Sequence, residues 1–172
     1  ASFAEKRGKI PLAEVIGYGA SMDAFHAVMP KPDGSGAKKA MEAALKDADL
    51  SPDSIEYINA HGTGTYHNDG MEARAILSLF GERGKTIPTS SIKPFIGHLL
   101  SAAGAVETVA SLLPFVHGII PPTLHFKTPD PECPIYCVPN NSISANPDII
   151  MKNSYGLGGQ NTSLILGKIG IS

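Results

Sequence analysis

The pattern of apolar and polar residues divides the chain into short apolar runs and longer amphipathic stretches. Residues 10–18 and 55–58 are mostly apolar and end in turns rich in glycine or polar residues, which is typical of buried strands. Residues 86–91, which precede the polar turn at residues 93–98, are interpreted as a short buried strand. Residues 149–155 and 163–168 flank a glycine-rich turn and indicate an antiparallel pair. The pattern therefore predicts a strand in each of these five places.

Helical periodicity separates the runs. Residues 37–48 repeat alanine, methionine and leucine at spacings of three and four, which predicts an amphipathic helix. We expect a second helix to begin at Asn68-Asp69-Gly70, with Asp69 as N-cap and Glu72 as its capping-box partner, and to end at residues 81–84. From Leu99 the chain is apolar on nearly every face, which is typical of a helix buried on several sides.

This order of elements predicts one α/β domain whose sheet is covered by helices on both sides. A chain of 172 residues, 42% of them hydrophobic and 17% charged, is long and apolar enough to bury a substantial core. No repeat or second domain boundary interrupts it.

Charge and apolar length exclude several functional classes. The net charge is −2 with both signs interspersed, so we expect no nucleic-acid partner and no membrane-surface binding. Residues 99–116 are apolar but include Glu107 and three hydroxyl side chains, which argues against a transmembrane span. Because the first residues lack the order of a signal peptide, we expect a cytoplasmic protein.

The two cysteines, Cys133 and Cys137, form a C-x₃-C pair without a second pair at metal-binding spacing. Two thiols in such a protein are usually free and reduced. Neither lies in an evident electropositive turn, so we expect neither to be a nucleophile.

Three turns after predicted strands contain the residues with chemical potential. The first has His61, Thr63 and Thr65, the second has Lys93 and His98, and the third is the glycine-rich loop at residues 156–159. If the strands share a sheet edge, these turns converge, as a catalytic site requires.

His98 directly precedes the apolar helix, whose dipole disfavours imidazolium, and a neutral imidazole can donate a hydrogen bond to an oxyanion. The alternative is that His98 only caps the helix. Thr63 and Thr65 suit an elongated, amide-bearing ligand, or else satisfy the backbone of their turn. Glu107, in a buried helix, must be paired, hydrogen-bonded or bound to a cation.

Together the turns resemble the β-ketoacyl-acyl carrier protein synthases of the condensing-enzyme, or thiolase-fold, superfamily, nearest to the bacterial type II elongating synthases and polyketide ketosynthases. The motifs are Asn59-Ala60-His61-Gly62-Thr63-Gly64-Thr65, Ser91-x-Lys93-x-x-x-Gly97-His98 with the helix up to Glu107, and Asn153-Ser154-x-Gly156-x-Gly158-Gly159-x-Asn161. The resemblance covers residues 10–166 and implies an α/β, thiolase-like half with a mixed sheet covered by helices on both faces.

The resemblance implies a decarboxylative Claisen condensation, in which the carbanion from malonyl-acyl carrier protein attacks an acyl group on a cysteine. His61 and His98 would donate hydrogen bonds to the malonyl thioester carbonyl, and Lys93 would orient and tune them. Thr63 and Thr65 would hold the phosphopantetheine arm of acyl carrier protein, and no other cofactor is implied.

Two further sets of residues acquire implied roles. The loop of Gly156, Leu157, Gly158 and Gly159 would gate the acyl pocket, although elongating synthases usually have a bulky aromatic residue where this chain has Leu157. In some family members a monovalent cation lies among the positions that match Asn59, Ala60, Glu107, Asn153 and Ser154.

The family's nucleophilic cysteine belongs to an N-terminal half that the 172-residue chain does not match. We therefore expect one C-terminal domain over residues 1–172, a fragment or one chain of a split enzyme, inactive without its N-terminal half and a homodimer when complete. One alternative is a non-catalytic partner resembling a chain-length factor, which would not need both histidines and Lys93. Another is a thiolase acting on coenzyme A esters, but residues 156–159 lack the cysteine of its glycine-rich turn.

Overall fold

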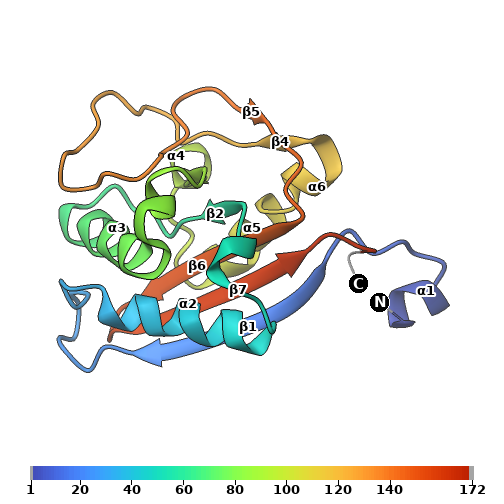
Figure 1. The fold of residues 1–172 in the computed structure, drawn as a ribbon, viewed down its shortest axis with the longest axis horizontal. Helices are drawn as coiled ribbons and strands as arrows, with labels where there is room; N and C mark the ends of the chain where they lie inside the picture. Colours follow the sequence, from blue (N-terminus) through green and yellow to red (C-terminus); the bar gives the residue numbers. More distant parts are fainter. Residues whose placement is uncertain (1, 171–172) are drawn as a thin grey trace.

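The computed structural model describes residues 2–170, which fold around a five-stranded mixed sheet with the strand order β1-β7-β6-β2-β3 (Figure 1). The strands are β1 (Glu14–Met22), β2 (Tyr57–Asn59), β3 (Thr89–Ser90), β6 (Ile149–Gly156) and β7 (Gln160–Gly167). β7 pairs antiparallel with β1 and β6, whereas β2 pairs parallel with β6 and β3. A separate antiparallel pair joins β4 (Ile119–Ile120) to β5 (Ile143–Ser144).

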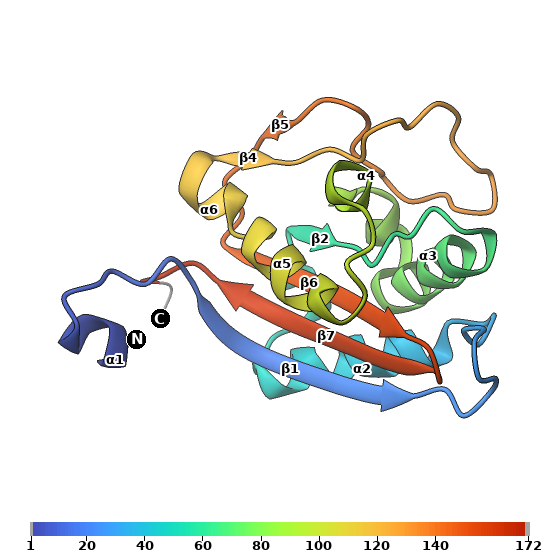
Figure 2. The same ribbon diagram turned by 180° about the vertical axis from the view of Figure 1, so that it is seen from behind.

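Helices cover both faces of the sheet, as the sequence predicted. The helices are α1 (Ser2–Lys6), α2 (Ser35–Asp47), α3 (Tyr66–Phe80), α4 (Lys93–Ile96), α5 (Ala103–Ala110) and α6 (Leu113–His117), with 3₁₀ segments η1 (Pro52–Ser54), η2 (Gly81–Lys85) and η3 (Leu100–Ala102). α2 packs on β1 and β7 beside α3, and α5 lies on the opposite face against β6 (Figure 2).

The central strands are buried on both faces, so each of them contributes to two hydrophobic clusters. Ile58 and Met151 point into the larger cluster beneath α2 and α3. Their neighbours Tyr57 and Ile150 point into a smaller cluster on the other face. Successive residues of a strand alternate between faces, and here both faces exclude water.

β1 begins at residue 14 and continues to residue 22, whereas the sequence predicted residues 10–18. The prediction took Gly17 and Gly19 as the strand's end, but both glycines lie inside it. A Cβ at Gly19 would overlap the carbonyl oxygen of Ala40, and one at Gly17 would overlap that of Ala44. The glycines therefore let α2 lie close on the sheet.

α3 begins at Tyr66 with Thr65 as its N-cap, so the predicted start and capping box at Asp69 are wrong. Asp69 lies in the first turn, where its carboxylate accepts the Gly64 N–H at 3.2 Å. Glu72 points away from that turn to a backbone site described below. Because the helix starts three residues before Asp69, the Asp69 side chain lies inside the first turn and does not cap the helix.

The apolar stretch after Leu99 forms η3, α5 and α6 in succession (Figure 2). The prediction that this stretch is a helix buried on several sides is wrong for the described residues. Only Ala103 and Glu107 of α5 are buried, and Val109 is 68% exposed. By length and composition alone, Leu100–His117 could cross a membrane. This stretch is not one continuous helix. It includes Glu107, whose carboxylate pairs with Lys93 and Lys152.

Replacing Gly19 by alanine should destabilise the intact protein by about 1–3 kcal/mol, because the new methyl group has to displace the backbone of α2. Urea unfolding measures this change. Gly70→Ala is the matched control, since its methyl group would meet only the flexible Arg74 side chain within α3. Equal stabilities of Gly19→Ala and the parent protein would contradict the packing role of Gly19.

Candidate active site

The site lies where parallel strands end at one edge of the sheet. Asn59, the last residue of β2, is in register with Ser90 of β3 and Lys152 of β6. His61 follows β2 by two residues, and Lys93 opens α4 just after β3. Parallel pairing therefore brings residues far apart in the sequence to one place.

Two histidine rings lie edge to face at this edge of the sheet. The centroids of His61 and His98 are 5.4 Å apart with an interplanar angle of 80°. His61 is buried, with 6% of its surface exposed, whereas His98 is exposed on the segment between α4 and η3. The structure thus brings the first and second predicted turns together.

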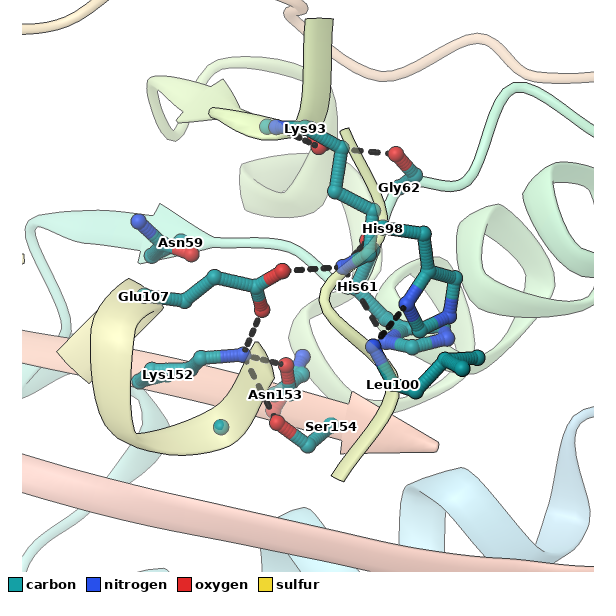
Figure 3. A network of polar contacts seen from close by, with 12 residues as sticks. Asn59, His61, Gly62, Lys93, His98, Leu100, Glu107, Lys152, Asn153 and Ser154 are labelled. Carbon is teal, nitrogen blue, oxygen red and sulfur yellow. Dashed lines mark hydrogen bonds and ion pairs between the residues drawn. The ribbon is translucent and has the colours of Figure 1, made fainter. Parts of the chain in front are cut away.

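The contacts of His61 determine which ring nitrogen carries its proton. Lys93 Nζ lies 3.3 Å from His61 Nδ1 and also contacts the His61 carbonyl oxygen (Figure 3). Because an ammonium has no lone pair, Nδ1 accepts this hydrogen bond and the ring proton resides on Nε2. Burial, followed by the positive charges of Lys93 and Lys152 and by His98, lowers the pKa of His61 to about 3. His61 is therefore a neutral Nε2–H donor.

His98 has the same tautomer for a different reason. The backbone N–H of Leu100, the first residue of η3, donates to His98 Nδ1 at 3.1 Å (Figure 3). A ring whose Nδ1 accepts an N–H holds its proton on Nε2 when neutral. His98 thus accepts an N–H at the start of a helical segment, and that contact also orients the ring. Two neighbouring Nε2–H donors suit an oxygen on which negative charge develops.

Glu72 holds the backbone of the histidine turn, a role that the sequence interpretation missed. Its carboxylate accepts the N–H groups of His61 and Gly62, each at 2.9 Å. The side chain is 2% exposed, and burial raises its pKa while the two N–H groups oppose that shift. The available signal was an acidic residue beside Met71 on the apolar face of its helix.

Glu107 is paired with two lysines at the centre of the network in Figure 3. Lys93 Nζ lies 2.5 Å from Oε1 and Lys152 Nζ lies 2.6 Å from Oε2. All three side chains are buried. Burial lowers the pKa of Lys152, and the Glu107 carboxylate opposes this shift. Lys152 was also missed, although its signal was a charged residue directly after the apolar run of β6.

An open cleft of about 760 Å³ borders the site, with His98 but not His61 among its described lining residues. Thr63, Lys93 and His98 line it together with residues 123–130. The Thr63 and Thr65 hydroxyls are hydrogen-bonded to each other at 2.9 Å, and of the two only Thr63 lines the cleft.

Both cysteines, which are free thiols, also line this cleft. Burial is the largest effect on each and raises the pKa of Cys133 and of Cys137. A raised pKa leaves less of the reactive thiolate near neutral pH.

The third predicted turn joins β6 to β7 and lies apart from the cleft. None of Gly156, Leu157, Gly158 and Gly159 is among the cleft's described lining residues, and Leu157 is 72% exposed. The loop is tied instead to the segment after β1, since Gly158 N–H donates to Ala27 O at 2.7 Å. Tyr155, just before the loop, lies beside His61, with the two ring centroids 5.5 Å apart.

Residues 12–127 match the family model for the β-ketoacyl synthase C-terminal domain. This chain belongs to that family. The 3-oxoacyl-[acyl-carrier-protein] synthase 2 of Coxiella burnetii is 42% identical over 166 residues, which are 96% of this chain and 40% of that protein. A Staphylococcus aureus protein of the same name is 43% identical over 162 residues, which are 94% of this chain and 40% of that protein. The chain thus spans about 40% of the length of these relatives.

Solved structures of ketosynthases share the fold. The ishigamide ketosynthase/chain length factor has a TM-score of 0.92 at 39% identity, covering 98% of this chain and 41% of that one. A type II polyketide ketosynthase, in complex with its acyl-carrier protein and bound to the hexaketide, has a TM-score of 0.94 at 35% identity, covering 98% and 41%. A β-ketoacyl synthase from Burkholderia phymatum has a TM-score of 0.91 at 34% identity, covering 98% and 40%.

The monovalent cation that the family resemblance implies does not fit the residues of this ketosynthase domain. Lys152 Nζ donates to Glu107 Oε2, to the Asn153 carbonyl oxygen and to Ser154 Oγ (Figure 3). Three of the five implied ligand residues therefore already bind an ammonium group. Asn59 Oδ1 is buried without a hydrogen-bond partner among the described residues.

His61 should remain a neutral Nε2–H tautomer from about pH 8 down to about pH 5 in the intact protein, because its pKa is lowered to about 3 from 6.5. NMR of nitrogen-labelled histidine distinguishes the tautomers and imidazolium. Because the unfolded chain takes up this proton more readily, His61 should make the fold less stable as the pH falls below 6.5. An Nδ1–H tautomer, or imidazolium at about pH 6, would contradict the assignment.

Replacing Glu72 by glutamine should destabilise the protein by about 1–3 kcal/mol, because an amide accepts only one of the two backbone N–H groups and leaves the other buried without a partner. Chemical denaturation provides the measurement. The control is Glu82→Gln, which removes an exposed ion pair with Lys85 and should cost no more than about 1 kcal/mol. Similar losses in both variants would refute the role given to Glu72.

Proposed function

We propose that this chain provides the enolate-stabilising half of a β-ketoacyl-acyl carrier protein synthase. The observation that supports this most directly is that Nδ1 of both histidines accepts a hydrogen bond, from Lys93 and from the Leu100 N–H. Each ring is left with a proton on Nε2. Two such donors can share the carbonyl oxygen of a malonyl thioester, an arrangement of the oxyanion-hole type.

In the proposed reaction, the bond between the malonyl carboxylate and its neighbouring carbon breaks and carbon dioxide leaves. The electron pair of that bond enters the thioester as an enolate, whose oxygen accepts hydrogen bonds from His61 and His98. A neutral imidazole is a far weaker acid than imidazolium, so it stabilises the enolate without protonating its carbon. The lowered pKa of His61 fits this requirement. The carbanion then attacks the acyl thioester and expels the cysteine thiolate.

The acyl-bearing cysteine is proposed to come from an N-terminal half, since burial raises the pKa of both Cys133 and Cys137. Its docking surface would be the exposed apolar side chains of η3, α5 and β1. These are Leu100, Val106, Val109, Val15 and Tyr18. Such a surface would otherwise face water at a cost. The complete enzyme is proposed to be a cytoplasmic homodimer.

The cleft beside Thr63 is proposed to take the phosphopantetheine arm of acyl carrier protein, with no other cofactor. An arm of this kind is long and has amide groups, and Thr63, Ser91 and Lys93 provide polar groups in the cleft wall. The exposed Leu157 loop is proposed to gate the acyl pocket once the N-terminal half is in place. A leucine there would close the pocket with less bulk than an aromatic ring.

A non-catalytic role like that of a chain-length factor is the alternative. Several structural relatives are described as pairs of a ketosynthase and a chain length factor. A subunit that only shapes a pocket has no need of a lysine that sets the tautomer of a buried histidine. The contact between Lys93 and His61 therefore favours catalysis.

Replacing His61 or His98 by alanine in the intact enzyme should each slow malonyl decarboxylation about 100- to 1,000-fold, because one oxyanion donor is lost. Release of carbon dioxide from malonyl-acyl carrier protein measures this step. Acyl transfer to the cysteine, followed by mass spectrometry, should be little changed. The exposed His117 on α6 offers the control His117→Ala, which should keep the parent rate. Decarboxylation at the parent rate in His61→Ala would rule out the proposed role.

A further inference from the structure

We propose that the ammonium of Lys152 acts as a covalently attached cation, which makes this site independent of added Na⁺ or K⁺. The inference deepens the proposed function, and it rests on that function only for its activity readout. The structural basis of the proposal is the set of contacts around the Lys152 ammonium.

The ammonium of Lys152 is fully engaged. A lysine has three N–H donors, and here three acceptors surround it: Glu107 Oε2 at 2.6 Å, Ser154 Oγ at 2.7 Å and the Asn153 carbonyl oxygen. The side chain is only 1% exposed, so water does not complete the arrangement. One carboxylate, one hydroxyl and one carbonyl oxygen are also the kinds of ligand that a hard monovalent ion takes.

The position of Lys152 follows from the sheet. Its backbone is in register with Asn59, the last residue of β2, where the parallel strands end. The side chain points to the face covered by α5, where Glu107 is the acidic residue that meets it (Figure 3). It then reaches along its own strand to Asn153 and Ser154. A side chain from β6 thus fills the space between β6 and α5.

Charge argues against an additional ion at this point. Glu107 already neutralises one of the two ammonium groups that it contacts, so the three side chains together have one net positive charge. An alkali ion beside Lys152 would add a second positive charge in a buried place, where like charges are weakly screened. Three of the acceptors that such an ion would use, on Glu107, Asn153 and Ser154, are already hydrogen-bonded to Lys152.

The attached cation also affects the histidine. Lys152 is one of the positive charges that lower the pKa of His61. A bound alkali ion dissociates at low salt, whereas a lysine remains at all salt concentrations. The electrostatic environment of His61 is therefore the same whichever salt surrounds the protein.

The experiment compares the intact protein in NaCl, KCl and choline chloride at equal ionic strength, with thermal unfolding and malonyl decarboxylation as separate readouts. The parent protein should have the same Tm and the same rate in all three salts. Lys152→Ser shortens the side chain and frees the oxygens of Glu107, Asn153 and Ser154. In this variant, K⁺ or Na⁺ should raise Tm above its value in choline, and the rate should rise about tenfold or more. Lys85→Ser, which removes a surface lysine, should respond to no cation.

A parent protein whose Tm or rate is higher in KCl than in choline chloride would overturn the proposal. A rubidium ion bound at Glu107 in crystals of the parent protein would also overturn it. A folded Lys152→Ser protein that no cation stabilises would also overturn it, because the lysine would then not be acting as an ion. If Lys152→Ser does not fold, the salt comparison and the rubidium soak of the parent protein decide. A cation-independent Tm in a parent protein that does not decarboxylate malonyl thioesters would refute the proposed function and leave this inference standing.

Discussion

The hydrogen bond from Lys93 to Nδ1 of His61 is the contact on which the rest of the site depends. It determines the tautomer of a buried ring, and it does so only because Glu107 holds the lysine in place from the other side. Without the carboxylate, burying the ammonium would be costly. Without the ammonium, the ring would be free to place its proton on either nitrogen. A pair of charges thus controls the chemistry of a neutral group.

The fold positions this contact by means of three neighbouring parallel strands. β2 leads to His61, β3 leads to Lys93, and β6 provides Lys152, all at one edge of the sheet. Glu72 reaches this edge from α3 on one face, and Glu107 reaches it from α5 on the other. The two buried acids therefore have different tasks. One binds backbone N–H groups and the other binds lysines.

Local sequence patterns predicted the structural features that are determined by residues close together in the chain. The helical period of α2 and the glycine-rich turn between β6 and β7 were both evident in the sequence. The limits of β1 were not, because Gly17 and Gly19 serve a helix that packs on them from residues 35–47. The contact between Lys152 and Glu107 joins residues 45 positions apart, so it depends on the tertiary fold and not on a local pattern. The apolar pattern of α5 predicted burial, but burial depends on what packs against a helix, and only Ala103 and Glu107 of α5 are buried in the described residues.

We propose that His61 and His98 present two Nε2–H donors to one oxygen. The most direct test is a crystal structure of the intact protein with a non-hydrolysable malonyl-pantetheine analogue. The analogue's carbonyl oxygen should lie within hydrogen-bond distance, about 2.7–3.2 Å, of Nε2 of both rings. An analogue whose carbonyl oxygen contacts neither ring, while its pantetheine arm fills the cleft beside Thr63, would contradict it.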